Sequence, residues 1–283
     1  MATIAITGAT GYVGGVLAAG FERNGDNLLF LIRERDRAPL SQGIAMPWRL
    51  GQEATFDKIP DMVIHAAWQM NATDRENRET NVRGSLTFLD SCFRQGVPRI
   101  VFVSTMSAYD GTPSAYGISK RMVEVAVLSR GGTVVRPGLV WGEKAGGVFG
   151  AIQRLASRFP VVAIPSASHP SLFMCHAGDL SKLFVFLAHC SPSAMRGKTY
   201  IAAHRQPMFL TDVVKAMVTL QGRKCLLLRV PWQFPWMLLK TGEHLGLRLP
   251  LRSESLLNIV HGPASCDTSS LETTGIVFRG FGQ

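Results

Sequence analysis

The stretch Thr7-Gly8-Ala9-Thr10-Gly11-Tyr12-Val13-Gly14 decides the fold of this chain. A β-branched run at 3–7 precedes it, and a helical pattern at 12–24 follows it. In a βαβ unit, the first glycine permits a tight turn, the second lets the backbone approach a pyrophosphate, and the third lets the helix pack against the strand. Because the first N–H groups of a helix attract phosphate, the stretch predicts a dinucleotide-binding turn.

Short β-branched runs alternate with helical patterns over the first two thirds of the chain. This alternation is typical of an α/β fold with a parallel sheet and crossover helices. Several runs are apolar almost throughout, such as Ile100-Val101-Phe102-Val103, and they predict a doubly wound sheet buried on both faces. The predicted strands are 3–7, 27–33, 61–66, 99–104 and 133–136, and the predicted helices are 12–24, 77–95 and 114–130.

A second, smaller lobe is expected toward the carboxyl terminus, because after about residue 159 the periodicity loosens and Pro, Ser and His become frequent. We expect residues 1–160 to form the dinucleotide-binding domain, completed by 171–203. Residues 161–170 and 204–283 are expected to form the substrate-binding lobe. Further helices are predicted at 178–189, 210–220, 236–245 and 253–260, with strands near 199–202 and 224–229.

Composition narrows the class of protein. The 283 residues are 46% hydrophobic, enough to bury one large core and a smaller lobe. The net charge of +10 is spread along the chain rather than gathered in one basic block, so no nucleic-acid partner is expected. No apolar stretch is long enough to span a bilayer and no targeting segment precedes the first strand, which predicts a cytoplasmic protein without a transmembrane segment. Five cysteines without close pairing predict neither disulfides nor a metal site.

The glycine spacing is similar to that of the extended short-chain dehydrogenase/reductase superfamily, the NAD-dependent epimerase/dehydratase family. Further segments resemble this family in the same order, clearly over residues 1–187 and weakly beyond. They are Asp61-Met62-Val63-Ile64-His65-Ala66-Ala67, Asn81-Val82-Arg83-Gly84-Ser85, Arg136-Pro137-Gly138-Leu139-Val140-Trp141-Gly142 and 173–180. The resemblance implies a Rossmann fold that binds a nicotinamide dinucleotide.

The resemblance also implies a set of cofactor-binding residues. They are Gly8, Thr10, Gly11, Tyr12, Val13, Arg33, His65, Ala66, Ala67, Asn81, Ser104, Tyr116, Lys120, Pro137 and Gly138. Within the set, Asn81 is expected to brace backbone rather than react. His65, and His176 outside the set, are expected to be structural histidines rather than catalytic ones.

The end of the second predicted strand bears on which dinucleotide is bound. Arg33 stands where an arginine accommodates the 2′-phosphate of NADP, and two more arginines follow it, so NADP(H) is favoured. Glu34 comes one residue later and would suit NAD(H) if the strand ended late, so NAD(H) stays open. The family commonly carries an acidic residue after its third strand to contact adenine. Here Trp48 and Arg49 stand instead, and we expect them to stack on the base.

Tyr116 and Lys120 are the expected chemical centre. They lie four residues apart in Tyr116-Gly117-Ile118-Ser119-Lys120 and so share one face of a helix. A phenol has an unperturbed pKa near ~10, and a nearby cation lowers that pKa by favouring phenolate. Tyr116 is therefore expected to exchange a proton with a substrate oxygen, and the resemblance gives Lys120 a second role at the nicotinamide ribose.

A hydroxyl is needed to orient the same substrate oxygen, and Ser104-Thr105-Met106-Ser107 follows a strand at the carboxyl edge of the sheet. Matched to the family pattern with Tyr109 as its later aromatic, Thr105 takes the catalytic hydroxyl position, with Ser107 in reserve. Dehydratases of this family usually carry an acidic pair where Met106-Ser107 stands, so dehydration is not expected. Only 11 positions separate Thr105 from Tyr116 (116 − 105), which predicts a substrate mouth lacking part of its usual wall.

The segment 230–240, Val-Pro-Trp-Gln-Phe-Pro-Trp-Met-Leu-Leu-Lys, is rich in large apolar groups. It suits a pocket for a lipid-like or aromatic substrate, contact with a membrane surface, or the packing of a proline-started helix in the core. Core packing is the favoured interpretation from the sequence.

The functional hypothesis is an oxidoreductase that reduces a keto group or oxidises the matching alcohol. Its expected partner is a small-molecule substrate, a nucleotide-activated sugar in the first place, and the resemblance implies a homodimer built on paired helices. A nucleotide-sugar epimerase that retains its NAD is the nearest alternative. A dinucleotide-binding sensor or assembly subunit without catalysis is the alternative from another class of protein.

Overall fold

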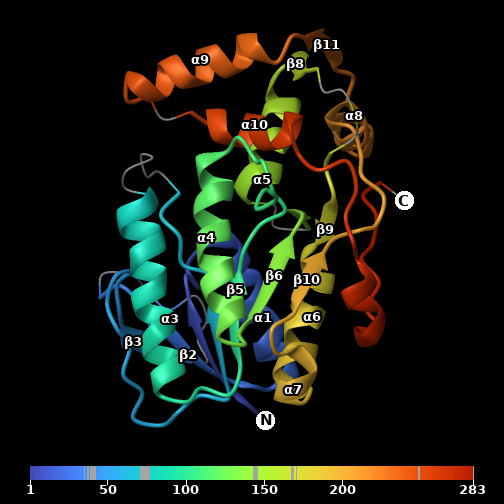
Figure 1. Cartoon of the computed structure of the whole chain (residues 1–283). Helices are drawn as coiled ribbons and strands as arrows, with labels where there is room; N and C mark the ends of the chain where they lie inside the picture. Colours follow the sequence, from blue (N-terminus) through green and yellow to red (C-terminus); the bar gives the residue numbers. More distant parts are fainter. Residues whose placement is uncertain are drawn as a thin grey trace.

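A computed structural model describes residues 1–34, 36, 38, 43–70, 77–142, 146–166, 169, 171–247 and 249–282 (Figure 1). Across these residues a central sheet holds seven strands, all parallel, in the order β10-β6-β5-β4-β1-β2-β3. The order reverses beside β1, which pairs with β2 on one side and β4 on the other. The strands are β1 (Thr3–Thr7), β2 (Asn27–Ile32), β3 (Ile44–Pro47), β4 (Met62–His65), β5 (Ile100–Val103), β6 (Thr133–Pro137) and β10 (Thr199–Ala202).

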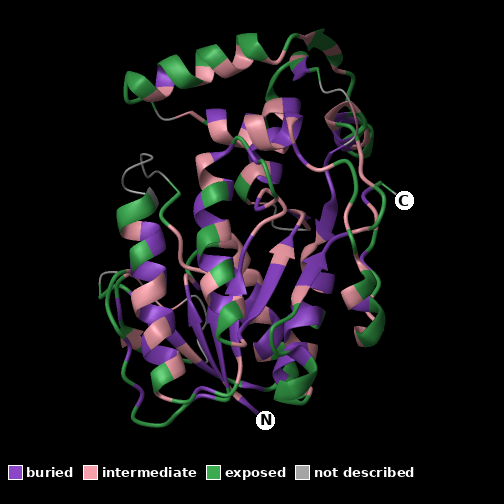
Figure 2. Ribbon diagram, in the orientation of Figure 1, coloured by how far each residue is buried: buried purple, intermediate pink, exposed green. Residues whose placement is uncertain are grey.

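Helices cover both faces of this sheet, as the apolar strands predicted. Helices α1 (Tyr12–Asn24) and α6 (Ala177–His189) lie on one face, where Phe21 and Phe184 are fully buried. Helices α3 (Gly84–Arg94) and α4 (Ala115–Ser129) lie on the other, with Phe88 and Val123 in the core. Figure 2 shows the strands buried between helices whose outer sides are exposed. The doubly wound α/β fold is therefore confirmed.

The ends of most predicted elements agree closely with the structure. The strands at 3–7 and 199–202 and the helices at 12–24, 210–220 and 253–260 have the predicted ends. The helix predicted at 77–95 differs, because it begins as a π-helical segment, η1 (Asn77–Arg83), before α3. The edge strand β3 was given no bounds from the sequence, since most of its side chains are exposed and it lacks a buried pattern.

A smaller lobe stands above the carboxyl edge of the sheet (Figure 1). It contains the parallel pair β8 (Val161–Pro165) and β11 (Leu226–Val230). Its other described elements are α8 (Leu210–Leu220), α9 (Gln233–His244) and α10 (Ser253–Val260). Helix α5 (Gly147–Arg158) shares a core with α8, where Ile152 and Met217 are buried together. The domain boundary at residue 160 stays a prediction, and this shared core favours a boundary before α5.

Two further features join the sheet to the lobe. Strands β7 (Leu139–Trp141) and β9 (Met174–His176) form a parallel pair beyond β6. After a short 3₁₀ helix, η2 (Ser269–Thr274), the chain returns to the first domain and buries Phe278 in the core under α1 and α6. No helix among the described residues is both long and apolar enough to cross a bilayer.

Candidate active site

The glycine turn forms a close contact with the end of β4. Gly8 has φ +70°, and a Cβ there would lie 2.6 Å from the backbone nitrogen of Ala67. A Cβ on Gly14 would lie 2.2 Å from the Gly8 carbonyl oxygen, so the start of α1 packs directly on the turn. Gly11 is the N-cap residue of α1 and offers no side-chain cap, which leaves the first N–H groups of the helix to another acceptor. This cradle fits the pyrophosphate of a dinucleotide.

The side chains around the turn keep it open at the surface. Thr10 and Gly11 are exposed, and Val13 is half-buried. The Tyr12 ring is also half-buried, and a Cβ on Gly146 would touch it, so this ring packs beside the start of α5. Burial raises the pKa of Tyr12. The predicted residues of the turn thus lie together at one end of β1.

His65 is enclosed rather than facing a cofactor. Its side chain has no exposed surface, Nδ1 lies 2.8 Å from Thr7 Oγ1, and Nε2 lies 2.9 Å from Ser85 Oγ. Burial, with the charge of Lys120 as a second cause, lowers the pKa of His65 to about 3. The structural role is therefore supported, and a cofactor contact by this side chain is not. Backbone N–H groups of Ala66 and Ala67 donate to Thr7 Oγ1 at 3.2 and 3.1 Å, fixing the loop after β4.

Two other predicted cofactor residues are also turned into the protein. Asn81 is fully buried, accepts from the Gln69 N–H at 2.7 Å and donates to the Gln69 carbonyl at 3.1 Å, so it braces backbone as expected. The Ser104 hydroxyl is sealed from solvent and has no hydrogen-bond partner within the described chain. Its main-chain N–H donates to the Val135 carbonyl and holds the end of β5 against β6.

The adenine end departs from the sequence prediction at one residue. Trp48 is buried between β4 and α3, its ring 4.8 Å from that of Phe88, and its Nε1 donates to the Gln52 carbonyl. The predicted stacking of Trp48 on adenine is therefore wrong, because the apolar core takes the indole. Arg33 is half-exposed after β2 and forms two hydrogen bonds to Asp36. Residues 35 and 37, the two following arginines, lie outside the described residues.

Tyr116 and Thr105 come together at the carboxyl edge of the sheet. Thr105 follows β5, Tyr116 lies in the first turn of α4, and both side chains line the same cavity, where Thr105 acts to lower the pKa of Tyr116. Ser114 caps α4 by accepting from the Gly117 N–H at 3.2 Å. A Cβ on Gly117 would lie 2.2 Å from the Ser107 carbonyl oxygen, so the helix start packs tightly on the loop that carries the hydroxyl. The predicted pair of phenol and hydroxyl is thus one unit.

Lys120 lies beneath this pair and faces the sheet. Its Nζ donates to the Val103 carbonyl at 2.7 Å and lies 4.1 Å from the centre of the Trp68 ring. The ammonium is 5.9 Å from the centre of the Tyr116 ring. Burial lowers the pKa of Lys120 to about 7, and Glu124 acts in the opposite direction. The Val103 carbonyl takes one of the three ammonium donors, so a contact with a ribose would use another.

The predicted lowering of the Tyr116 pKa is wrong for this arrangement. Burial raises the pKa of Tyr116 to about 12, and the hydrogen bond to Thr105 compensates only in part. The cause is desolvation of the phenolate, which the Lys120 ammonium, 5.9 Å from the ring centre, does not offset. At neutral pH the phenol therefore keeps its proton, as a proton donor requires.

A cavity of about 890 Å³ opens beside the hydroxyl pair. Thr105, Ser107 and Tyr116 line its floor with Pro137 and Gly138, so the reserve hydroxyl and two predicted cofactor residues face the same space. Most of the wall is apolar and comes from the ends of strands, from the β9 region and from the lobe. These residues are Trp68, Met70, Met106, Leu139, Val148, Leu172, Phe173, Leu245, Ile259 and Pro263.

Helices α9 and α10 close the side of the cavity above the short connection between Thr105 and Tyr116. The Ser114 hydroxyl donates to Glu254 of α10 at 2.7 Å, and the Tyr109 hydroxyl donates to the His261 carbonyl just after α10. Lys240 and Arg252 bring positive charge to the wall. Arg252 donates to the Met70 carbonyl at 2.6 Å, so it also ties the lobe to the loop after β4.

Trp68 is the site residue that sequence reasoning missed. It lines the cavity, stands edge-on to the Tyr116 ring at 5.9 Å between ring centres, and covers the Lys120 ammonium. The signal was its position directly after Ala66-Ala67, at the carboxyl end of a central strand where ligands bind.

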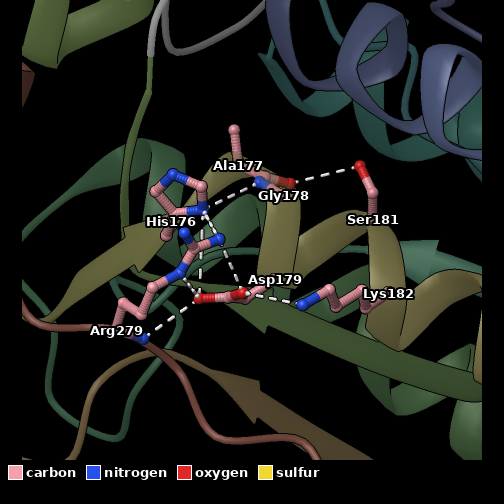
Figure 3. Close-up of polar contacts among 7 residues, drawn as sticks. All are labelled: His176, Ala177, Gly178, Asp179, Ser181, Lys182 and Arg279. Carbon is pink, nitrogen blue, oxygen red and sulfur yellow. Dashed lines mark hydrogen bonds and ion pairs between the residues drawn. The ribbon is translucent and has the colours of Figure 1, made fainter.

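His176 belongs to a polar cluster away from this cavity (Figure 3). Its Nδ1 accepts from the Gly178 N–H at 3.1 Å and from Arg279 Nη2 at 2.6 Å. Arg279 also makes three hydrogen bonds to the buried Asp179 carboxylate. Arg279 holds the pKa of Asp179 below its ordinary value, although burial alone would raise it. The cluster anchors the end of the chain, which supports the structural role predicted for His176.

The apolar segment 230–240 is not core. Most of it forms α9, and only Gly242 of this helix is buried. Phe234, Met237 and Leu238 are exposed. The favoured interpretation of core packing is therefore wrong, because the helix lies at the outer end of the lobe and many of its residues are exposed (Figure 2). It begins at Gln233, three residues before the prediction, since proline is tolerated in a first helical turn.

Comparisons with known proteins agree with this geometry. Residues 4–221 match the family model described as the NAD dependent epimerase/dehydratase family. The chain is 26% identical over 237 residues to the ceramide reductase of Caulobacter vibrioides (strain NA1000 / CB15N), covering 81% of this chain and 73% of the relative. It is 24% identical over 274 residues to a Stigmatella aurantiaca protein, covering 85% and 78%. That protein is named 4-hydroxy-2-methyl-3-oxo-4-farnesyl-3,4-dihydroquinoline-1-oxide ketoreductase.

The solved structure of MoeE5 in complex with UDP-glucose and NAD has the same fold. It superimposes with a TM-score of 0.71 at 16% identity, covering 98% of this chain and 94% of that one. A model match over residues 4–221 spans more than half of the 283 residues. This chain therefore belongs to the NAD-dependent epimerase/dehydratase family, whose members are NAD(P)-dependent oxidoreductases and epimerases of the short-chain dehydrogenase type.

Proposed function

We propose that this chain is a ketoreductase that interconverts a carbonyl and the matching alcohol on a substrate with a large apolar part. The observation that carries the proposal is that Tyr116 and Thr105 both line one mostly apolar cavity. Apolar walls bind apolar surface, and the two hydroxyls are the polar groups that would orient the reacting oxygen. The names of two relatives, a ceramide reductase and a ketoreductase of a farnesylated compound, support an apolar substrate.

The chain's own residues would handle the proton. In the reductive direction, Thr105 donates a hydrogen bond to the carbonyl oxygen, and Tyr116 transfers its proton there as the carbon is reduced. The nicotinamide supplies the hydride when bound. Lys120, behind the ring, would stabilise the phenolate until Tyr116 takes a proton back from water. Because burial raises the Tyr116 pKa to about 12, the phenol is protonated before each turnover at neutral pH.

NADP(H) is the proposed cofactor, with NAD(H) as the alternative. Arg33 lies after β2 with half of its side chain exposed, where a 2′-phosphate would lie if the dinucleotide runs from the glycine turn across the sheet edge. Asp36 holds this guanidinium at 2.8 Å and would compete with the phosphate. An Arg33→Ser variant should therefore lower kcat/KM with NADPH more than with NADH.

A nucleotide-activated sugar is the second candidate substrate. Lys240 and Arg252 in the cavity wall would suit a diphosphate, but Glu243 and Glu254 line the same wall and Arg252 pairs with Glu243. An epimerase would keep its NAD through purification, whereas a ketoreductase exchanges the cofactor at each turnover. The helix face of α4 that carries the exposed side chains of Ile118, Met122 and Val125 is the proposed homodimer surface.

Tyr116→Phe tests the function directly. Loss of a general acid costs roughly 10²–10⁴-fold in rate, so kcat for reduction of a long-chain ketone should fall by that factor. NADPH binding, measured by fluorescence titration, should stay within roughly twofold, since the phenyl ring remains. The matched control is Tyr109→Phe, which removes a phenol hydroxyl that donates to the His261 carbonyl outside the cavity wall. Full activity of Tyr116→Phe would support the non-catalytic sensor and overturn the proposal.

A further inference from the structure

The outward face of α9 is apolar, the reverse of an ordinary surface helix. Four apolar side chains lie on one side of the helix. Met237, Leu238 and Leu245 follow Phe234 by three, four and eleven residues, which is the spacing of one helix face. Their exposed fractions are 65%, 59%, 75% and 69%. A helix at the surface of a globular protein normally turns polar side chains to water, so this face is built for contact with something apolar.

Exposed apolar side chains also occur on the strand before the helix. Leu226 and Leu228 of β11 are exposed, and β11 ends at Val230, just before α9, at the outer end of the lobe (Figure 1). We call these six side chains, Phe234, Met237, Leu238, Leu245, Leu226 and Leu228, the α9–β11 surface. Figure 2 shows exposed residues along both elements.

Charge around the α9–β11 surface is positive. Between residues 221 and 247 the chain has four cations, Arg223, Lys224, Arg229 and Lys240, and all four are exposed. The single carboxylate in this range, Glu243, accepts hydrogen bonds from the N–H and hydroxyl of Ser253 and pairs with Arg252. The carboxylate is thus turned inward, and an apolar face flanked by cations complements an anionic interface.

The same helix borders the cavity. Lys240, Thr241, His244 and Leu245 line the cavity wall, and Leu245 is at once part of the α9–β11 surface. Leu245 therefore joins the α9–β11 surface to the cavity wall.

We propose that the α9–β11 surface docks on an anionic phospholipid bilayer, from which an apolar substrate enters the cavity. The apolar side chains would lie among the acyl chains near the headgroups, and the flanking cations would pair with anionic headgroups. Docking itself does not need the proposed oxidoreduction, because none of the six side chains belongs to the hydroxyl pair, whereas the entry of an apolar substrate rests on the proposed function.

Vesicle flotation of the full chain tests the proposal. Wild type should bind vesicles of phosphatidylcholine with phosphatidylglycerol, bind pure phosphatidylcholine more weakly, and lose binding as salt is raised. Phe234→Asp/Leu238→Asp should bind the anionic vesicles at least roughly tenfold more weakly, because two charges enter the apolar contact. The matched control is Ile44→Asp/Val277→Asp, which places two charges on exposed apolar positions outside the α9–β11 surface and should bind as wild type.

Each outcome decides the proposal. Tyr116→Phe should float with vesicles as wild type does, so failed chemistry and failed docking are separate results. Turnover of a short water-soluble ketone should be unchanged in Phe234→Asp/Leu238→Asp, whereas turnover of a bilayer-dissolved ketone should fall. If wild type ignores anionic vesicles, or binding is equal in both Asp variants, the proposal is overturned. It is also overturned if light scattering shows that Phe234→Asp/Leu238→Asp converts a dimer to a monomer, which would identify a second copy as the occupant.

Discussion

His65 shows how a single buried side chain joins three elements. It lies on β4, contacts Thr7 of β1 through one ring nitrogen and Ser85 of α3 through the other. The ring is stacked on Phe102 at 5.9 Å between ring centres, so a charged imidazolium would lie in an apolar layer. Neutral His65 therefore stabilises the position of the strand end next to the glycine turn.

Acid should destabilise the fold through this residue. The folded pKa is about 3 and the ordinary value is 6.5, so the unfolded chain takes up a proton first as pH falls. The free energy of unfolding should therefore drop between pH 6.5 and about 4.5, by at most about 1.4 kcal/mol per pH unit. Urea unfolding across this range should show a shallower slope for His65→Asn, although that variant is less stable at pH 7.

This pH range distinguishes the effect of His65 on stability from the effect of the buried carboxylates. Asp26 and Asp179 have lowered folded pKa values against an ordinary value of 3.8, so their stabilising effect is lost only at lower pH. An equal slope in wild type and His65→Asn would show that the imidazole does not carry the effect.

Residue identities at the site were predictable where chemistry and position coincide. Tyr116, Thr105 and Lys120 follow from motif spacing and chain order, and the structure brings them within one region. The direction of the Tyr116 pKa was not predictable, because the depth of burial is a property of the packed molecule. The prediction for Trp48 failed for the same reason. The sequence does not tell whether an indole near the sheet edge packs into the core or faces the cofactor.

The glycine turn is the element that we propose holds the cofactor. Gly8 has a left-handed backbone and a neighbouring backbone nitrogen at 2.6 Å from an added Cβ. Gly25, the C-cap residue of α1, has a similar φ of +79° but open space where its Cβ would be. A substitution at Gly25 therefore tests the left-handed backbone alone, whereas a substitution at Gly8 tests the left-handed backbone and the close contact with Ala67 together.

Gly8→Ala and Gly25→Ala should both lose stability from a left-handed alanine, by about 1–2 kcal/mol. Only Gly8→Ala should also weaken dinucleotide binding, by at least roughly tenfold, because the turn must move away from Ala67 and its N–H groups lose their aim. Thermal unfolding and fluorescence titration with NADPH measure the two effects. Equal affinity in both variants would mean that the cradle is not where the pyrophosphate binds.

The ends of helices were predictable where buried residues repeat with the period of a helix. Helices α1, α8 and α10 have the predicted ends because their buried faces repeat clearly. Helix α5 received no prediction, since it begins at Gly146-Gly147 without a side-chain cap to mark its start. The π-helical start at Asn77–Arg83 leaves no distinct signal, because its residues suit an α-helix equally well.

The whole molecule is tied together by its last residues. Phe278 is buried in the core of the sheet, and Phe281 is buried in the core of the lobe, 5.0 Å from Trp141 between ring centres. Between them, Arg279 forms the hydrogen bonds to Asp179 seen in Figure 3. The sequence assigned this segment to the substrate lobe alone, because long-range pairing at a chain end carries no local pattern.

Removal of this link should loosen the joint between sheet and lobe. Arg279→Met leaves the buried Asp179 carboxylate with Lys182 at 3.9 Å, and should cost roughly 1.5–3 kcal/mol, nearer the lower figure because the guanidinium is half-exposed. The matched control is Arg205→Met, which removes an exposed pair with Glu272 and should cost at most about 1 kcal/mol. Chemical unfolding measures both, and equal costs would show that the tail is not a structural link.

We propose that Tyr116 and Thr105 hold the reacting oxygen in the cavity, beside a dinucleotide bound at the glycine turn. A crystal structure with NADP⁺ and an unreactive long-chain ketone analogue would locate both molecules. We expect the analogue's oxygen within about 2.6–3.2 Å of both hydroxyls, with the pyrophosphate at the start of α1. An analogue bound elsewhere, or a dinucleotide whose nicotinamide lies away from Tyr116, would contradict it.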